Sequence, residues 1–187
     1  MPVVGREGRS RRSAIREHFR IDPGKSIGLI YTGIFGLDEA AWADIGRFNE
    51  WEFLGIQPLP VRPPNYHIVD KRLFRYEDLS ASVDCVISKL GYGVYAESRL
   101  GGVPLLFCPR TDFAEYPVLE ASIMACGNGY RLGRDEFLDI RWGAALDWVR
   151  SGSHEPSQPN TGATLCARRI EEFARGGRES AGSPRNP

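Results

Sequence analysis

The stretch from Asp84 to Glu120 constrains the fold of this chain more than any other feature. Its sequence, DCVISKLGYGVYAESRLGGVPLLFCPRTDFAEYPVLE, predicts an apolar strand, a glycine turn, a helix, a second apolar strand and an acidic loop. A Gly-x-Gly turn between a strand and a helix places backbone N–H groups and the positive end of the helix dipole at the carboxyl edge of a sheet. The stretch therefore predicts both an α/β fold and an anion site.

Strands and helices alternate along most of the chain. This alternation predicts an α/β fold with a Rossmann-like, doubly wound parallel sheet. Ligands bind to such sheets outside the carboxyl ends of the strands, at the switch point of the strand order. The expected strands are residues 25–32, 51–56, 66–69, 85–88, 104–108 and 129–132, and the main expected helices are 13–19, 37–48, 92–100, 115–125, 134–149 and 164–174.

The composition indicates how the chain is divided into segments and which classes of partner are not expected. We expect a flexible arm at 1–12, one folded domain at 13–175 and a disordered tail at 176–187. Lys plus Arg and Asp plus Glu number 24 each, so no net charge draws the chain to nucleic acid or to a membrane surface. No apolar run reaches the roughly 20 residues of a membrane span.

The cysteines and histidines argue against a metal site. The four cysteines are widely spaced without a C-x-x-C pair, and only three histidines accompany them, so no zinc site is predicted. Cys85 and Cys108 fall in apolar strands and are expected to be small buried hydrophobes. This cysteine usage indicates a reducing, cytoplasmic compartment. No Ser/His/Asp arrangement is legible, so no catalytic residue is assigned.

The candidate ligand site starts at the Gly91-Tyr92-Gly93 turn. Ser88 and Lys89 precede the turn, and this hydroxyl and cation could contact a diphosphate. Glu97 lies four residues after Gly93, where a carboxylate can accept both hydroxyls of a ribose. The structural alternatives stay open: the glycines could only make a turn, Lys89 could be a solvated surface residue, and Glu97 could only favour the helix dipole.

Two further groups of residues complete the candidate site. Gly33 and Gly36 follow the first expected strand and could let the backbone approach a phosphate, or they could form a plain turn. Asp112 and Glu115 follow a later strand and could accept hydrogen bonds from sugar hydroxyls, although Glu115 could instead cap a helix. Arg110 could neutralise a phosphate or pair with Asp112.

These motifs resemble the C-terminal, donor-binding domain of GT-B glycosyltransferases, within the family that includes bacterial lipid II N-acetylglucosaminyltransferase. The stretch D-C-x-x-x-K-x-G-Y-G is also similar to the glycosyltransferase-like portion that precedes the kinase in plant L-arabinokinases. The resemblance covers roughly residues 13–150 and is specific across 84–121. The matching elements here are Asp84, CVIS, Gly91, Gly93, Glu97, Gly102-Val103-Pro104, Glu115-Tyr116 and Glu120-Ala121.

The resemblance implies a single GT-B half-domain and a role for several residues. Gly33 and Gly36 match the first glycine loop of the donor domain, and Gly91 and Gly93 match its phosphate-facing turn. By the same resemblance Glu97 binds the ribose and Glu115 contacts the sugar. Two positions depart from the pattern, since Tyr116 replaces a glutamine and Glu120 replaces an asparagine.

The resemblance also implies a function and partners. The leading hypothesis is the nucleotide-sugar-binding half of a glycosyltransferase, with a UDP-sugar as donor substrate and a hexosyl group as the group transferred. The acceptor and base would come from a separate N-terminal-half subunit, and no metal or other cofactor is implied because backbone dipoles stabilise the leaving diphosphate. The alternatives are a non-catalytic nucleotide- or sugar-phosphate-binding domain and an inactive remnant. An exposed apolar cleft wall would also allow a homodimer.

Overall fold

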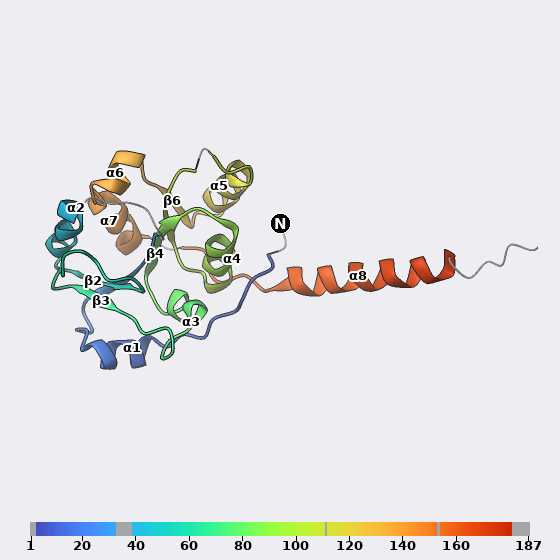
Figure 1. Cartoon of the computed structure of the whole chain (residues 1–187), viewed down its shortest axis with the longest axis horizontal. Coiled ribbons are helices and arrows are strands. Elements are labelled where there is room, and N and C mark those ends of the chain that lie inside the picture. The colour runs from blue at the N-terminus through green and yellow to red at the C-terminus, as the bar shows by residue number, and fades with distance from the viewer. Residues whose placement is uncertain (1–2, 33–38, 111, 153, 181–187) are drawn as a thin grey trace, which may run out of the picture.

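The computed structural model describes residues 3–32, 39–110, 112–152 and 154–180. Its centre is a six-stranded parallel sheet with helices on both faces, as Figure 1 shows. The strands are β1 (Ser26–Tyr31), β2 (Trp51–Gly55), β3 (Tyr66–Ile68), β4 (Cys85–Lys89), β5 (Leu105–Cys108) and β6 (Gly129–Arg131).

The strand order is β3-β2-β1-β4-β5-β6, and every neighbouring pair is parallel. The order reverses between β1 and β4, where Ile30 pairs with Ile87 and Tyr31 with Ser88. This arrangement confirms the α/β, doubly wound sheet that the alternation of elements predicts. The switch point of the sheet lies between the carboxyl ends of β1 and β4.

Two layers of helices bury the apolar side chains of the strands. One hydrophobic cluster joins Ile27 and Leu29 of β1 to α1, α3, α4 and α5, and the other joins Ile30 and Phe53 to α2, η1, α6 and α7. Cys85 and Cys108 lie buried in the second cluster as free thiols, which confirms their expected role as small hydrophobes. The helices are α1 (Arg12–Phe19), α2 (Glu39–Ala43), η1 (Asp44–Arg47), α3 (Tyr76–Ser80), α4 (Tyr92–Gly101), α5 (Tyr116–Ala125), α6 (Arg134–Leu138), α7 (Gly143–Ser151) and α8 (Thr161–Ser180).

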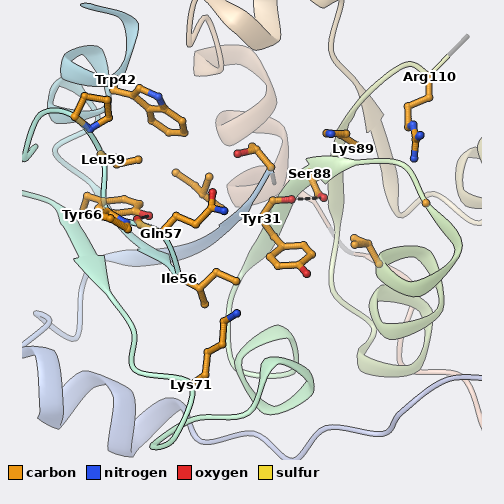
Figure 2. A pocket seen from close by; sticks show the side chains of 16 residues that line it. Tyr31, Trp42, Ile56, Gln57, Leu59, Tyr66, Lys71, Ser88, Lys89 and Arg110 are labelled. Carbon is orange, nitrogen blue, oxygen red and sulfur yellow. Dashed lines mark hydrogen bonds between the residues drawn. The ribbon is translucent and has the colours of Figure 1, made fainter. Parts of the chain in front are cut away.

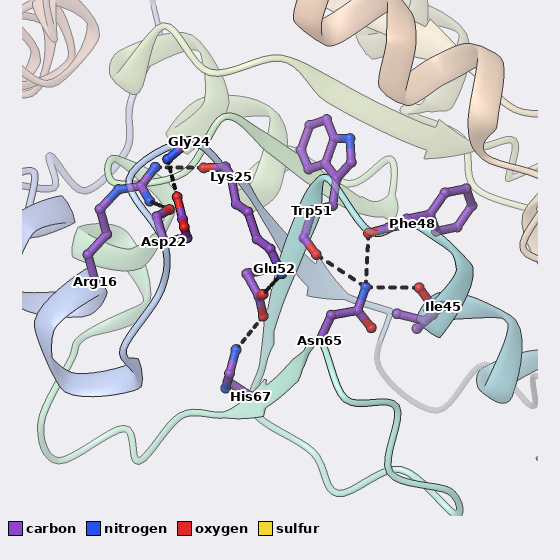
Figure 3. Close-up of polar contacts among 10 residues, drawn as sticks. All are labelled: Arg16, Asp22, Gly24, Lys25, Ile45, Phe48, Trp51, Glu52, Asn65 and His67. Atoms are coloured by element: carbon purple, nitrogen blue, oxygen red, sulfur yellow. Dashed lines mark hydrogen bonds and ion pairs between the residues drawn. The ribbon is translucent and has the colours of Figure 1, made fainter.

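A polar network connects residues near the N-terminal ends of β1, β2 and β3 (Figure 3). The carboxylate of Glu52 accepts a hydrogen bond from Lys25 Nζ at 2.5 Å and lies 2.7 Å from His67 Nε2. The amide of Asn65 donates to the backbone carbonyls of Ile45, Phe48 and Trp51, which fixes η1 against β2. His67 is thus part of a structural network at the edge opposite the switch point.

Two expected helices are each divided into two shorter elements in the described part of the chain. Within the expected helix 37–48, the described part is a five-residue α2 followed by the 3-10 turn η1. The expected helix 134–149 is broken into α6 and α7 because Ile140 has φ 55°, in the left-handed region. Ile140 is fully buried, so its packing in the second cluster accompanies this conformation, which a β-branched residue rarely adopts.

Parts of both ends of the chain have defined positions in the structure. Residues 3–11 lie against α3 and α4, with Val3 buried, and they are called the N-terminal arm below. Helix α8 runs to Ser180, beyond the expected end at 174, and projects from the body of the protein (Figure 1). No helix in the described part of the chain is both long enough and apolar enough to span a membrane.

Candidate functional site

Two adjoining cavities open at the carboxyl ends of β1, β2 and β4. The first has a volume of about 550 Å³ and the second about 370 Å³. Because both are lined by Tyr31, Ile56, Lys71, Gly91 and Val94, they form one continuous crevice. The crevice covers the switch point, which is where the strand order predicts a ligand site.

Cations and apolar side chains occupy opposite sides of the first cavity, as Figure 2 shows. Lys89, at the end of β4, and Arg110, after β5, lie on one side, while Trp42 and Leu59 lie on the other. Burial lowers the pKa of Lys89 below its ordinary value, and the nearby charge of Arg110 lowers it further. A bound anion would relieve this repulsion, so the cationic side is suited to phosphate groups.

Ser88 fastens the two strands that flank the switch point. Its hydroxyl donates a hydrogen bond of 2.5 Å to the backbone carbonyl of Tyr31, and the side chain is buried (Figure 2). The hydroxyl proton is therefore committed to β1, and Ser88 lines the cavity with an oxygen that can accept but does not donate. A direct Ser88 donor contact to a diphosphate would require this bond to break.

Helix α4 begins at the crevice with two glycines. Gly91 is the residue before the first helical turn and has extended φ and ψ of −142° and 160°, and Gly93 lies inside that turn. A Cβ atom built on either residue would meet no atom of the described residues within 4 Å. Neither backbone angle nor crowding within the chain requires glycine at Gly91, and Gly93 has no positive φ either. Both glycines line the crevice, so their missing side chains leave backbone N–H groups open to a ligand.

The second cavity contains a buried carboxylate. Glu97 on α4 is 6% exposed and lines this cavity. Arg6 of the N-terminal arm donates to Glu97 Oε1 through Nε at 3.1 Å and Nη2 at 2.7 Å. Burial raises the pKa of Glu97, the hydrogen bond and charge of Arg6 lower it, and Glu77 raises it again.

Two tyrosines lie beside Glu97. The rings of Tyr31 and Tyr76 have centroids 4.4 Å apart, and both side chains line the second cavity. The hydroxyl of Tyr76 is buried and has no hydrogen-bond partner among the described residues. Burial raises its pKa far above the ordinary value, so the hydroxyl stays protonated and can donate to a ligand.

The structure brings most of the predicted site residues to one crevice. Ser88, Lys89, Gly91, Gly93, Glu97 and Arg110 line it. Asp112 and Glu115 are exposed and line neither cavity, and the Asp112 carboxylate lies 3.9 Å from Arg110 Nε. Gly33 and Gly36 lie outside the described residues.

Lys71, Tyr76 and Arg6 are among the crevice residues that sequence reasoning missed. Lys71 follows β3, and the rule that parallel strands end at one edge could have found it. Tyr76 begins α3 and carries no motif that marks it. Arg6 reaches Glu97 across 91 positions of sequence, and no local pattern predicts that contact. Across the described residues, no group of three His, Cys, Asp or Glu side chains could hold a metal ion.

Comparisons with known proteins locate this fold. The chain matches no protein-family model. It is 29% identical over 116 residues to L-arabinokinase of Arabidopsis thaliana, a match that covers 61% of this chain and 11% of that protein. Its structure is similar to the spinosyn rhamnosyltransferase SpnG, with a TM-score of 0.60 and 16% identity over 81% of this chain and 43% of SpnG. It is also similar to the glycosyltransferase VinC in complex with dTDP, with a TM-score of 0.56 and 15% identity over 79% of this chain and 36% of VinC.

These similarities establish the fold. The chain has the fold of one half of a GT-B glycosyltransferase. This confirms, at the level of the fold, the GT-B resemblance that the Asp84–Glu120 stretch predicts. The chain spans less than half the length of SpnG and VinC and 11% of the L-arabinokinase.

Proposed function

We infer that this glycosyltransferase-like domain binds a nucleoside diphosphate sugar in the crevice at its switch point. In the proposed pose, the diphosphate lies between the start of α4 and the cations of the first cavity, and the ribose hydroxyls face Glu97. The donor would be a UDP-sugar, and the domain would support hexosyl transfer only together with a separate acceptor-binding domain that supplies the base. That domain could be an N-terminal-half subunit, and a homodimer of this chain is a further candidate assembly.

The observation that carries this proposal is that cationic side chains and a carboxylate flank the first residues of α4. Lys89 and Arg110 offer positive charge on one side of Gly91, and Glu97 offers a carboxylate on the other. A nucleoside diphosphate carries anionic phosphates and a neutral diol only a few ångströms apart, and it matches both sides. A simple phosphate would use only the cationic side.

The proposed chemistry of the site is electrostatic. Backbone N–H groups at the start of α4 and the two cations would stabilise negative charge on the departing nucleoside diphosphate. Burial makes these interactions stronger than they are in water. No residue of the crevice is assigned as a catalytic base.

One observation favours binding without transfer as the second candidate. The carboxylates predicted to hold the sugar, Asp112 and Glu115, are exposed and lie outside both cavities. Such a domain would recognise the nucleotide and regulate a partner, or would be an inactive remnant. UDP and a UDP-hexose would then bind equally well, whereas a donor site binds the sugar conjugate with a distinct affinity.

Calorimetric titration tests the proposal. The purified chain is titrated with UDP, GDP, dTDP, a UDP-hexose and inorganic phosphate. We expect saturable binding of at least one nucleoside diphosphate and much weaker binding of phosphate alone. Absence of heat with every nucleotide at millimolar concentration would reject the proposed function, and equal affinity for phosphate and nucleotides would reject the role of Glu97.

A further inference from the structure

The N-terminal arm is docked on the helices that form the second cavity. The backbone N–H of Val4 donates to Tyr92 Oη at 3.0 Å, and the backbone N–H of Arg9 donates to Asp78 Oδ1 at 2.8 Å. Gly8 sits so close to α3 that an added Cβ would lie 1.8 Å from the carbonyl oxygen of Glu77. The arm thus has a defined path, and that path brings Arg6 to the edge of the cavity.

Arg6 and Glu97 make an unequal pair. The Arg6 side chain is 66% exposed, whereas the Glu97 side chain is 5% exposed. Both hydrogen bonds from Arg6 end on Oε1 of Glu97, and within the described part of the chain no other side chain or N–H donates to this carboxylate. Arg6 also lies 3.7 Å from a carboxylate oxygen of Glu77. The geometry therefore fixes one oxygen of Glu97 and leaves Oε2 for another donor.

We propose that the N-terminal arm is part of the nucleotide site and that Arg6 is its positioning residue, which orients Glu97 through Oε1 so that Oε2 accepts the ribose hydroxyls. This inference rests on the proposed function, because it assigns the ligand of that same carboxylate. Arg6 itself touches the carboxylate and acts on the ligand through it.

Arg6 also favours the ionised form of Glu97. A carboxylate that accepts two hydroxyls must be charged, and burial disfavours the charged form. The charge of Arg6 opposes that effect and keeps the pKa of Glu97 from rising further. Around Glu97 the charged and titratable groups are Arg6 from the arm, Glu77 and Tyr76 from α3, and Tyr31, Lys71 and Tyr92 along the same cavity.

The first experiment needs no nucleotide. The side-chain carboxyl of Glu97 is titrated by NMR in the ligand-free wild type, in Arg6→Ala and in Arg6→Lys. We expect the pKa of Glu97 to be higher in Arg6→Ala than in the wild type, with Arg6→Lys between them. An unchanged pKa in Arg6→Ala would overturn the proposal whether or not the protein binds nucleotides, so this result is separable from the proposed function.

The second experiment measures UDP affinity against pH. We expect Arg6→Ala to weaken UDP binding about tenfold at neutral pH, the scale of one charge-assisted hydrogen bond. The acid limb of the affinity profile should move to higher pH, because Glu97 stays protonated to a higher pH. The ionisation of UDP itself is common to both proteins and cancels in the comparison. Dideoxy-UDP, which lacks both ribose hydroxyls, should bind the two proteins equally.

A substitution at Gly8 distinguishes the effect of the arm's position from the effect of the Arg6 guanidinium itself. Gly8→Ala keeps Arg6 but forces the arm away from α3, so it should reproduce the loss of UDP affinity and the raised Glu97 pKa. Gly143→Ala is the matched control, because a Cβ there meets no atom of the described chain within 4 Å and the residue lines neither cavity. If Arg6→Ala or Gly8→Ala binds UDP more tightly than the wild type, the arm competes with the ligand and the proposal is wrong.

Discussion

Replacing Gly93 by alanine is predicted to change stability and ligand binding in opposite directions. Gly93 lies in the first turn of α4 and has no positive φ, and a Cβ built on it meets no atom of the described residues within 4 Å. Alanine therefore fits the folded backbone and restricts the unfolded chain, which should raise the free energy of unfolding by about 0.4–1 kcal/mol. The open space is part of the second cavity.

The same methyl group would stand where a nucleotide approaches the backbone. Forcing an extra methyl into a filled site costs about 1–3 kcal/mol, which corresponds to a loss of roughly 5- to 150-fold in affinity. Urea unfolding and calorimetric titration with UDP measure the two effects on the same protein, with Gly143→Ala as the control for a helix glycine outside the crevice. Unchanged UDP affinity in a stabilised Gly93→Ala protein would refute the placement of the ligand over α4.

Three further predictions address single side chains. Glu97→Ala should weaken nucleotide binding by about 1–3 kcal/mol, the scale of a charged hydrogen bond, and calorimetry at neutral pH checks this value. Diphosphate binding should raise the lowered pKa of Lys89, so binding in alkaline buffers should take up protons. The affinity should therefore fall as the pH rises towards the ordinary lysine pKa. Binding heats measured in two buffers of different ionisation enthalpy detect the proton uptake, and Lys89→Arg should abolish it. Asp84→Ala should lower the free energy of unfolding by about 1–2 kcal/mol, allowing for its partial exposure, without changing nucleotide affinity, because Asp84 Oδ2 accepts from the backbone N–H of Ile27 and from Arg12 at the sheet edge opposite the crevice. A Glu97→Ala protein with wild-type affinity, a buffer-independent heat, or an Asp84→Ala protein with wild-type stability would each contradict the corresponding assignment.

The sheet could be predicted from sequence because local signals determine it. The apolar runs mark six strands to within about two residues, and the rule for right-handed crossovers then limits how parallel strands can be arranged. The position of the crevice follows from the rule that ligands bind beyond the carboxyl ends of parallel strands, since Lys89 ends β4 and Gly91 comes shortly after it. What failed locally was helix length: apolar spacing predicts one helix over 134–149, and the left-handed backbone of Ile140 divides it.

The second cavity could not be predicted in the same way because its parts meet only in the fold. Arg6 lies in a segment rich in Gly, Arg and Ser, which by composition indicates a flexible arm, and its partner Glu97 is 91 positions away. The sequence also could not predict that Asp112 is exposed to solvent, because an acidic loop has the same sequence whether it faces a ligand or solvent. Asp84, which opens the most informative stretch, lies at the start of β4, away from the crevice that the stretch predicts.

Amide NMR of the labelled protein during titration with UDP tests the central claim most directly. If the switch-point crevice binds the nucleotide, the amides of Lys89, Gly91 and Gly93 should shift together and saturate with one dissociation constant. Helix α7 on the opposite helix layer should stay unchanged. Saturable shifts confined to residues outside the two cavities, or no shifts at millimolar UDP, would contradict the account.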